Sequence, residues 1–128
     1  MQKCVVNITT TADGAENTIT REGKMSLSES LVKLTYCEEN ALICMELKGN
    51  TARMERSGDY SLKLALENGK AGQGEIGING VSGSIGTFTD RILYSVTEDS
   101  LHAILHYDLL IAGQRQKMRL NLRAKFVE

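Results

Sequence analysis

Residues 101–126 read LHAILHYDLLIAGQRQKMRLNLRAKF, and this stretch sets the class of fold. Apolar and polar side chains alternate along both of its halves, which is the period of a β-strand with one buried face. Gly113 and Gln114 lie between the halves and predict a two-residue hairpin turn with glycine first. This turn places Leu105 opposite Leu122, so that almost every inward-facing pair is apolar.

The middle of the chain repeats the alternation in shorter runs. Glu39–Asn40 and Gly49–Asn50 are turn dipeptides that separate runs at residues 31–38, 41–48 and 51–56. They predict a three-stranded meander. Its outer face then carries opposite charges at paired positions, Lys33 with Glu46 and Glu46 with Arg53.

Two further hairpins are indicated by turn dipeptides. Asp13–Gly14 predicts one near the amino terminus, and Asn68–Gly69 is the strongest short hairpin signal in the chain. After Asn68–Gly69 the alternation loses its phase. A bulge near Gly72 or Gly74 would return the isoleucines at 76 and 78 to the inward face.

These runs add up to nine or ten short strands, with at most one helical turn at residues 25–31. An open antiparallel meander of this length would expose two unpaired edge strands. We therefore predict an all-β fold in which residues 1–128 form a single domain, a closed antiparallel β-barrel of 8–10 strands with meander topology.

Composition excludes several classes of protein. The 15 basic and 16 acidic residues give a net charge of -1, so no global field attracts nucleic acid or an anionic membrane. Residues 1–8 lack the continuous apolar run of a signal peptide, and no apolar stretch is long enough to span a membrane. The odd set of Cys4, Cys37 and Cys44 favours free thiols and a cytoplasmic location.

Arg56 is the most informative candidate for a site. The meander places it on the inward face opposite Ile43, where a charged group needs a partner or a ligand. An arginine among tyrosines predicts binding of an anionic or amphipathic small molecule, inside or at the mouth of the barrel. The alternative is that Arg56 pairs with Glu38 and the interior is packed solid. The other inward-facing polar candidates are Tyr36, Tyr94, Tyr107 and Gln116, and Tyr60 if its strand keeps this phase.

Two motifs resemble a cofactor site and a metal site, but the sequence around them does not support either function. Residues 72–77 match G-x-G-x-x-G, but a further turn follows where a dinucleotide site needs a helix. His102 and His106 would lie about 13 Å apart along a strand, too far to share one zinc ion. We therefore expect neither a cofactor nor a metal.

A basic stripe follows the carboxyl-terminal strand on its outer face. It is the only surface of the sequence that could favour a phosphate backbone, although Asp108 would lie opposite Arg119 and few aromatic residues are available for base stacking. Weak contact with nucleic acid is therefore a third alternative. The stripe consists of Arg115, Lys117, Arg119, Arg123 and Lys125.

Five short segments follow one another in an order that is similar to a known family. They are residues 20–23 (TREG), 36–39 (YCEE), 56–58 (RSG), 83–92 (GSIGTFTDRI) and 107–113 (YDLLIAG). In these segments the chain resembles the YwiB-like bacterial family of unknown function. The resemblance implies a calycin or lipocalin-like barrel and a cytoplasmic bacterial protein, and it implies no known reaction. Arg56 and Gly58 match a motif of that family.

Besides weak contact with nucleic acid, we consider three hypotheses on function. The first is a non-enzymatic barrel that binds a small ligand near Arg56, Tyr36 and Glu38. The second is a structural or protein-interaction barrel with a filled interior, which acts through its outer face or an edge strand, as a monomer or as a homo-oligomer. The third is an enzyme in which Glu38 and Tyr36 act as acid and base, although no catalytic motif requires it.

Overall fold

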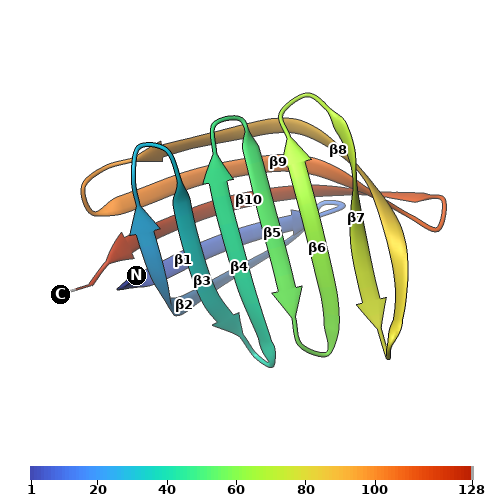
Figure 1. Cartoon of the computed structure of the whole chain (residues 1–128), viewed down its shortest axis with the longest axis horizontal. Coiled ribbons are helices and arrows are strands. Elements are labelled where there is room, and N and C mark those ends of the chain that lie inside the picture. The colour runs from blue at the N-terminus through green and yellow to red at the C-terminus, as the bar shows by residue number, and fades with distance from the viewer. Residues whose placement is uncertain (128) are drawn as a thin grey trace.

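The computed structural model describes residues 1–127, and ten strands contain most of them. Each strand pairs with its neighbours in chain order, and β1 pairs with β10, which closes the barrel (Figure 1). The prediction of an all-β, closed antiparallel meander is confirmed, and residues 1–127 contain no helix that could cross a membrane. The strands are β1 (Gln2–Ala12), β2 (Ala15–Leu27), β3 (Val32–Glu38), β4 (Ala41–Lys48), β5 (Thr51–Ser57), β6 (Tyr60–Glu67), β7 (Ala71–Ile78), β8 (Val81–Val96), β9 (Ser100–Ile111) and β10 (Gln114–Phe126).

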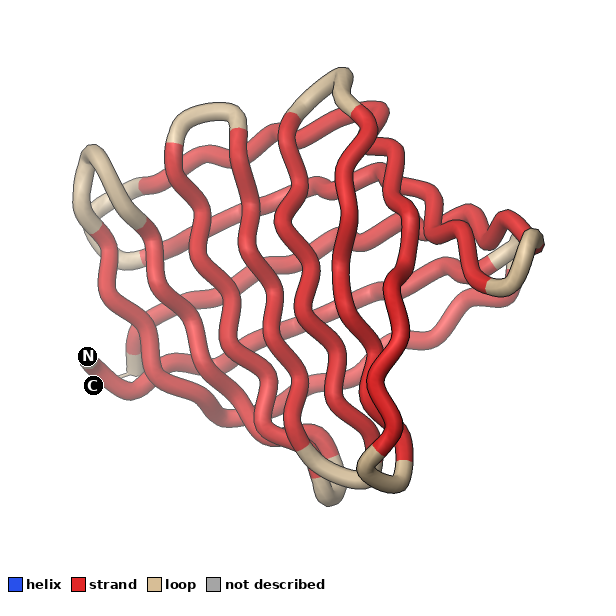
Figure 2. The backbone as a smooth tube through the Cα atoms, turned by 45° about the vertical axis from the view of Figure 1, so that its right-hand side comes forward, coloured by secondary structure: helices blue, strands red, loops and turns tan. Residues whose placement is uncertain are grey.

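The barrel is flattened into two layers whose strands cross at a large angle. In Figure 1, β3 to β7 form the front layer, and β1, β9 and β10 run behind them. Strands β2 and β8 pass from one layer to the other, and in Figure 2 the chain begins and ends on the same side. Such corners are typical of sheets that pack nearly orthogonally.

Each corner has a local cause. Strand β2 pairs with β1 over its length up to Met25 but with β3 only from Gly23 onward. A Cβ atom on Gly23 would collide with the carbonyl oxygen of Thr35, so glycine permits this close crossing. In β8 the register shifts between Thr89 and Arg91, which is a β-bulge that bends the strand.

The predicted registers of the short strands are confirmed. The turns Glu39–Asn40 and Gly49–Asn50 place Ile43 opposite Arg56. The outer face carries the expected pairs of Lys33 with Glu46 and of Glu46 with Arg53. The Asp13–Gly14 hairpin is also confirmed, with Ala12 opposite Ala15.

The predicted register of the carboxyl-terminal hairpin is wrong by two residues. The turn consists of Ala112 and Gly113, which have φ angles of 51° and 78°, and Leu105 lies opposite Leu120. Positive φ at both central residues is the type I′ geometry that matches the twist of a hairpin. Because a shift of two residues preserves the face of every side chain, the predicted inward set is still correct.

The predicted helical turn at residues 25–31 is also wrong. Strand β2 continues to Leu27. A short loop follows, in which the Ser28 hydroxyl donates to the Leu31 carbonyl at 2.8 Å and accepts from the Leu31 N–H at 3.1 Å. The serine thus supports a tight connection between strands.

The phase change after Asn68 and Gly69 is confirmed. The first ladder pair is Leu64 with Gly74, so one extra residue lies on the β7 side, and Ile76 faces inward opposite Leu62. The turn itself packs against the β8 bulge. The Asn68 side-chain oxygen accepts the Ile92 N–H at 2.7 Å, and the Gly69 N–H donates to the Thr89 carbonyl at 2.8 Å.

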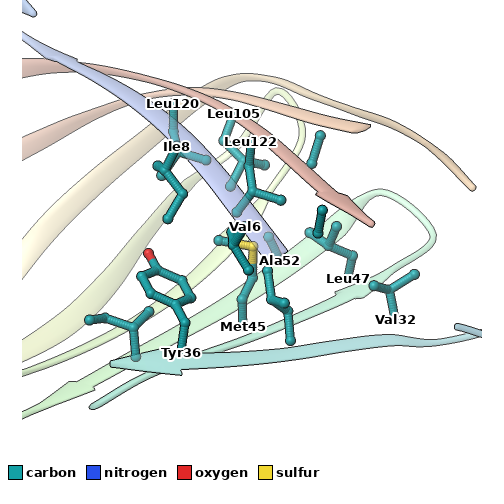
Figure 3. Close-up of a cluster of buried hydrophobic side chains, with 14 of the residues drawn as sticks. Val6, Ile8, Val32, Tyr36, Met45, Leu47, Ala52, Leu105, Leu120 and Leu122 are labelled. Carbon is teal, nitrogen blue, oxygen red and sulfur yellow. The ribbon is translucent and has the colours of Figure 1, made fainter. Parts of the chain in front are cut away.

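The core is one cluster between the two layers. It contains 23 buried apolar side chains, which fill the interior from both walls. In Figure 3, Met45 and Leu47 of the front layer project toward Leu105 and Leu122 of the back layer. Burial of each such side chain contributes about 1.5–3 kcal/mol, so this cluster is the main source of stability.

Candidate functional site

A cavity of about 390 Å³ opens at the end of the barrel that carries the β1–β2, β3–β4 and β5–β6 turns. We call it the mouth cavity. It lies where β2 has separated from β3, since these strands pair only from Gly23 to Leu27. Side chains and rim residues from both layers line it, namely Thr10, Ala12, Ala15, Asn17, Tyr36, Glu38, Glu39, Ile43, Met54, Glu55, Arg56, Tyr60, Leu62, Tyr107, Met118 and Leu120.

Four of the six candidate residues meet at this cavity. They are Tyr36, Glu38, Arg56 and Tyr107. Tyr94 lines a different cavity of about 570 Å³, beside the β2–β3 and β8–β9 connections. Gln116 lies half-buried on β10 opposite Leu109, outside the set of residues that line the mouth cavity.

Arg56 is held by the turn that follows its own strand. One guanidinium nitrogen lies 2.8 Å from an Asp59 carboxylate oxygen, and the other donates to the Tyr60 carbonyl at 2.8 Å. The guanidinium carbon lies 3.7 Å from the centroid of the Tyr60 ring, a cation–π contact. The predicted pairing of Arg56 with Glu38 is therefore wrong. The hydrogen bond from Arg56 lowers the pKa of Asp59 below its ordinary value.

The rim of the mouth cavity is fixed by a close crossing of two turns. A Cβ atom on Gly58 would lie 2.6 Å from the carbonyl oxygen of Asn40. The β5–β6 turn therefore rests on the β3–β4 turn, and Gly58 makes this approach possible. Sequence reasoning missed Asp59 as the partner of Arg56, although its position one residue after Gly58 in a tight turn was a usable signal.

Two tyrosines occupy the floor of the cavity from opposite layers. Tyr36 of β3 and Tyr107 of β9 are 6% and 3% exposed. Figure 3 shows the Tyr36 hydroxyl projecting into the barrel toward Ile8. Within residues 1–127 neither phenolic oxygen takes part in a side-chain hydrogen bond.

Burial raises the pKa of both phenols, which are protonated at neutral pH. Desolvation raises the pKa of Tyr107 to about 12, with Tyr60 as a second cause. The pKa of Tyr36 is raised by desolvation first, then by the negative charge of Glu38 and by Tyr107. Neither phenolic oxygen is among the fully buried atoms of residues 1–127 that lack a partner, so both are accessible from the cavity and available as donors to a bound molecule.

The basic stripe lies on the outer face of β10, and the corrected register changes its neighbours. Asp108 lies opposite Lys117 and forms an ion pair with Arg115 at 3.2 Å. Arg119 lies opposite His106, so the predicted pairing of Asp108 with Arg119 is wrong. His102 and His106 both lie on the outer face of β9, and residues 1–127 contain no cluster of three or more potential metal-ligating side chains.

Comparisons with known proteins identify a family and a fold. A family described as a domain of unknown function, DUF1934, matches residues 3–122. The crystal structure of the ywiB protein from Bacillus subtilis is similar with a TM-score of 0.84, at 15% sequence identity, over 99% of this chain and 93% of that one. No curated protein matches. The YwiB-like resemblance is thus confirmed, and the chain belongs to the DUF1934 family of unknown function.

Proposed function

We propose that the protein is a non-enzymatic binding barrel that holds a small amphipathic molecule in the mouth cavity. The volume of about 390 Å³ lies within the usual range of ligand sites. The lining combines apolar side chains with a few polar groups, which is the composition that such sites need. The observation that carries the proposal is the pair of buried phenols, Tyr36 and Tyr107, whose hydroxyls have no side-chain partner within residues 1–127.

The contacts divide the cavity into an apolar part and a polar part. Leu62 and Met118 supply apolar surface for a hydrocarbon body. Tyr36 and Tyr107 can donate hydrogen bonds to an oxygen of the ligand. Arg56 has five N–H donors, of which its contacts with Asp59 and Tyr60 leave several free for an anionic head group.

Binding of decanol and decanoate, measured by calorimetry, tests the proposal. We expect Tyr36→Phe combined with Tyr107→Phe to weaken binding of both compounds, because two donors are lost. Tyr94→Phe is the matched control, since Tyr94 lines another cavity, and it should leave affinity unchanged. Ala12→Phe should block the cavity.

The relative affinities of the two compounds distinguish an anionic ligand from a neutral one. Tighter binding of decanoate than of decanol that is lost in Arg56→Gln supports an anionic ligand. Equal binding of the two compounds supports a neutral amphipathic ligand. Failure of both compounds to bind, or full binding by the Ala12→Phe variant, would contradict the proposal.

A protein-interaction barrel is the alternative, and one observation favours it. Residues 15–22 of β2 pair with β1, whereas pairing with β3 begins only at Gly23. This segment is an unpaired sheet edge, which can accept a strand from another chain or from a second copy. Light scattering distinguishes a monomer from a homo-oligomer. A dimer that is lost in Thr18→Pro, with ligand binding intact, would support the alternative.

We also propose that the protein works in the cytoplasm as a calycin-like, lipocalin-like barrel. Cys4 is buried, Cys44 is half-buried and Cys37 is exposed, and all three are free. An exposed free thiol is better tolerated in a reducing compartment. Fractionation of cells that express the tagged chain would test the location.

A further inference from the structure

The outer face of β8, β9 and β10 concentrates positive charge. Strand β10 carries cations at five outward positions and has no carboxylate between Gln114 and Phe126. Because the whole chain has a net charge of only -1, this face is much more positive than the rest of the molecule. The five cations are Arg115, Lys117, Arg119, Arg123 and Lys125.

Nearby carboxylates neutralise only part of this charge. Asp108 lies 3.2 Å from Arg115, but Asp90 and Asp99 lie at the longer distances of 3.9 Å from Arg119 and 4.0 Å from Lys125. Lys117 and Arg123 form no ion pair within residues 1–127. The long, exposed pairs of Asp90 and Asp99 contribute little to stability, whereas Asp108 is buried and neutralises Arg115, so Lys117, Arg119, Arg123 and Lys125 remain available.

Two arginines flank a histidine across the centre of the stripe. The ladder places His106 between Arg119 of β10 and Arg91 of β8. Like charges at paired positions destabilise a sheet, so protonation of His106 between the two arginines is unfavourable and this row carries the charge of the arginines alone at neutral pH. Desolvation lowers the pKa of His106, and the charges of Arg119 and Arg91 add to this, while Asp90 acts in the opposite direction.

The surface is hollowed beside this row. A depression of about 250 Å³ is lined by the hydroxyl residues Thr9 and Thr11 of β1, by Asn121, and by His106 and Arg119. Hydroxyl, amide and guanidinium groups are the donors that proteins use to hold phosphate oxygens. A second hollow of about 500 Å³ follows along β10 beside Arg123 and Lys125.

We propose that this outer face binds the phosphodiester backbone of a single-stranded nucleic acid, with one phosphate in the hollow between Thr11, His106 and Arg119. Outward residues of a strand recur every ~6.8 Å, so the cations of β10 form a line, interrupted only at Asn121, that suits a linear polyanion. The face offers little aromatic surface for stacking, so binding rests on phosphate contacts, which carry no sequence information, and is independent of base sequence. This surface is separate from the mouth cavity and does not depend on the function proposed for it.

Fluorescence anisotropy of a labelled twenty-nucleotide oligothymidylate, titrated with the full chain, tests the proposal. With three phosphate contacts, the logarithm of the affinity should fall against the logarithm of salt concentration with a slope of about -2. The variant Lys117→Gln, Arg119→Gln, Arg123→Gln should bind at least about tenfold more weakly and lose most of this slope. The matched control Lys33→Gln, Arg53→Gln, Lys63→Gln removes the same charge from the front layer and should retain affinity.

A second variant tests whether weaker binding of the triple variant is caused by misfolding. Lys117→Gln combined with Arg123→Gln leaves the contact of Arg119 with Asp90 in place and should reduce the slope by about 1.4. Equal weakening by the front-layer control would overturn the proposal, because binding would then follow net charge alone. Absence of binding at low salt would also overturn it. So would tighter binding of polyglutamate than of the oligonucleotide, which would indicate an acidic protein partner.

Discussion

The front and back layers of the barrel follow the same alternation but differ on their outer faces. In the front layer Glu46 lies between Lys33 and Arg53, so each charge has an opposite neighbour. In the back layer His106 lies between Arg119 and Arg91. Alternation and register are therefore sufficient to form each layer of the barrel. The order of charges on the outer face of a layer is free to vary. Around His106 the order of charges gives the sheet no stabilising ion pair between paired positions, and there we infer a role in binding.

The inner faces of the two layers are alike, in contrast to the charges on their outer faces. Leu47 in the front layer and Leu105 in the back layer are both fully buried in one cluster. We expect Leu47→Ala and Leu105→Ala each to lower the free energy of unfolding by about 2–5 kcal/mol. Urea unfolding followed by circular dichroism and by tyrosine fluorescence should give one coincident transition for both variants. Separate transitions would mean that the layers are independent units.

The corner that joins the layers should be the next most sensitive position. Gly23→Ala would press a Cβ atom against the Thr35 carbonyl, and we expect a loss of about 1–3 kcal/mol in unfolding free energy. Gly83 is the matched control, because a Cβ atom there meets nothing within 4 Å. Gly83→Ala should be neutral or slightly stabilising in the same urea assay. Equal effects at the two sites would show that the corner is not constrained.

Two turns show how much of the fold can be predicted from the sequence. Glu39–Asn40 was placed correctly because its flanking runs end at obvious polar residues. The β9–β10 turn was misplaced because its first residue is Ala112, which seldom adopts the positive φ of 51° found here. The predicted closure of the barrel and the predicted inward-facing residues are still correct, because they depend on the period of two and not on this turn.

The candidate site was predictable only in part. Tyr36, Arg56 and Tyr107 could be assigned to the inward face by phase alone. Phase does not say how far along the barrel a residue lies, which is why Tyr94 and Gln116 were grouped with them. The β8 bulge has neither glycine nor proline beside Asp90, so the break in alternation there is its only signal in the sequence.

Tyr107 gives a prediction at alkaline pH. Its pKa is raised to about 12 in the folded protein, above the value of about 10 for an unfolded chain. Between these values the folded state binds more protons, so the stabilising contribution is complete below pH ~10 and is lost as pH rises toward 12. Tyr107→Phe should flatten the decline of urea stability over this window. An unchanged decline would mean that Tyr107 ionises freely.

The smallest expected effect concerns His106 and the two arginines beside it. Because desolvation and the neighbouring arginines lower the pKa of His106, the unfolded chain binds more protons below pH ~6.5, and stability falls as the solution becomes more acidic. Arg119→Gln should raise the pKa of His106, measured by NMR titration of its ring protons. It should also recover on the order of a few tenths of a kcal/mol at acid pH. Arg53→Gln removes the same charge from a front-layer position opposite Glu46, so it should leave the His106 titration unchanged. If both variants moved the titration equally, the row would reflect only the net charge of the protein, and the contrast between the two outer faces would carry no functional meaning.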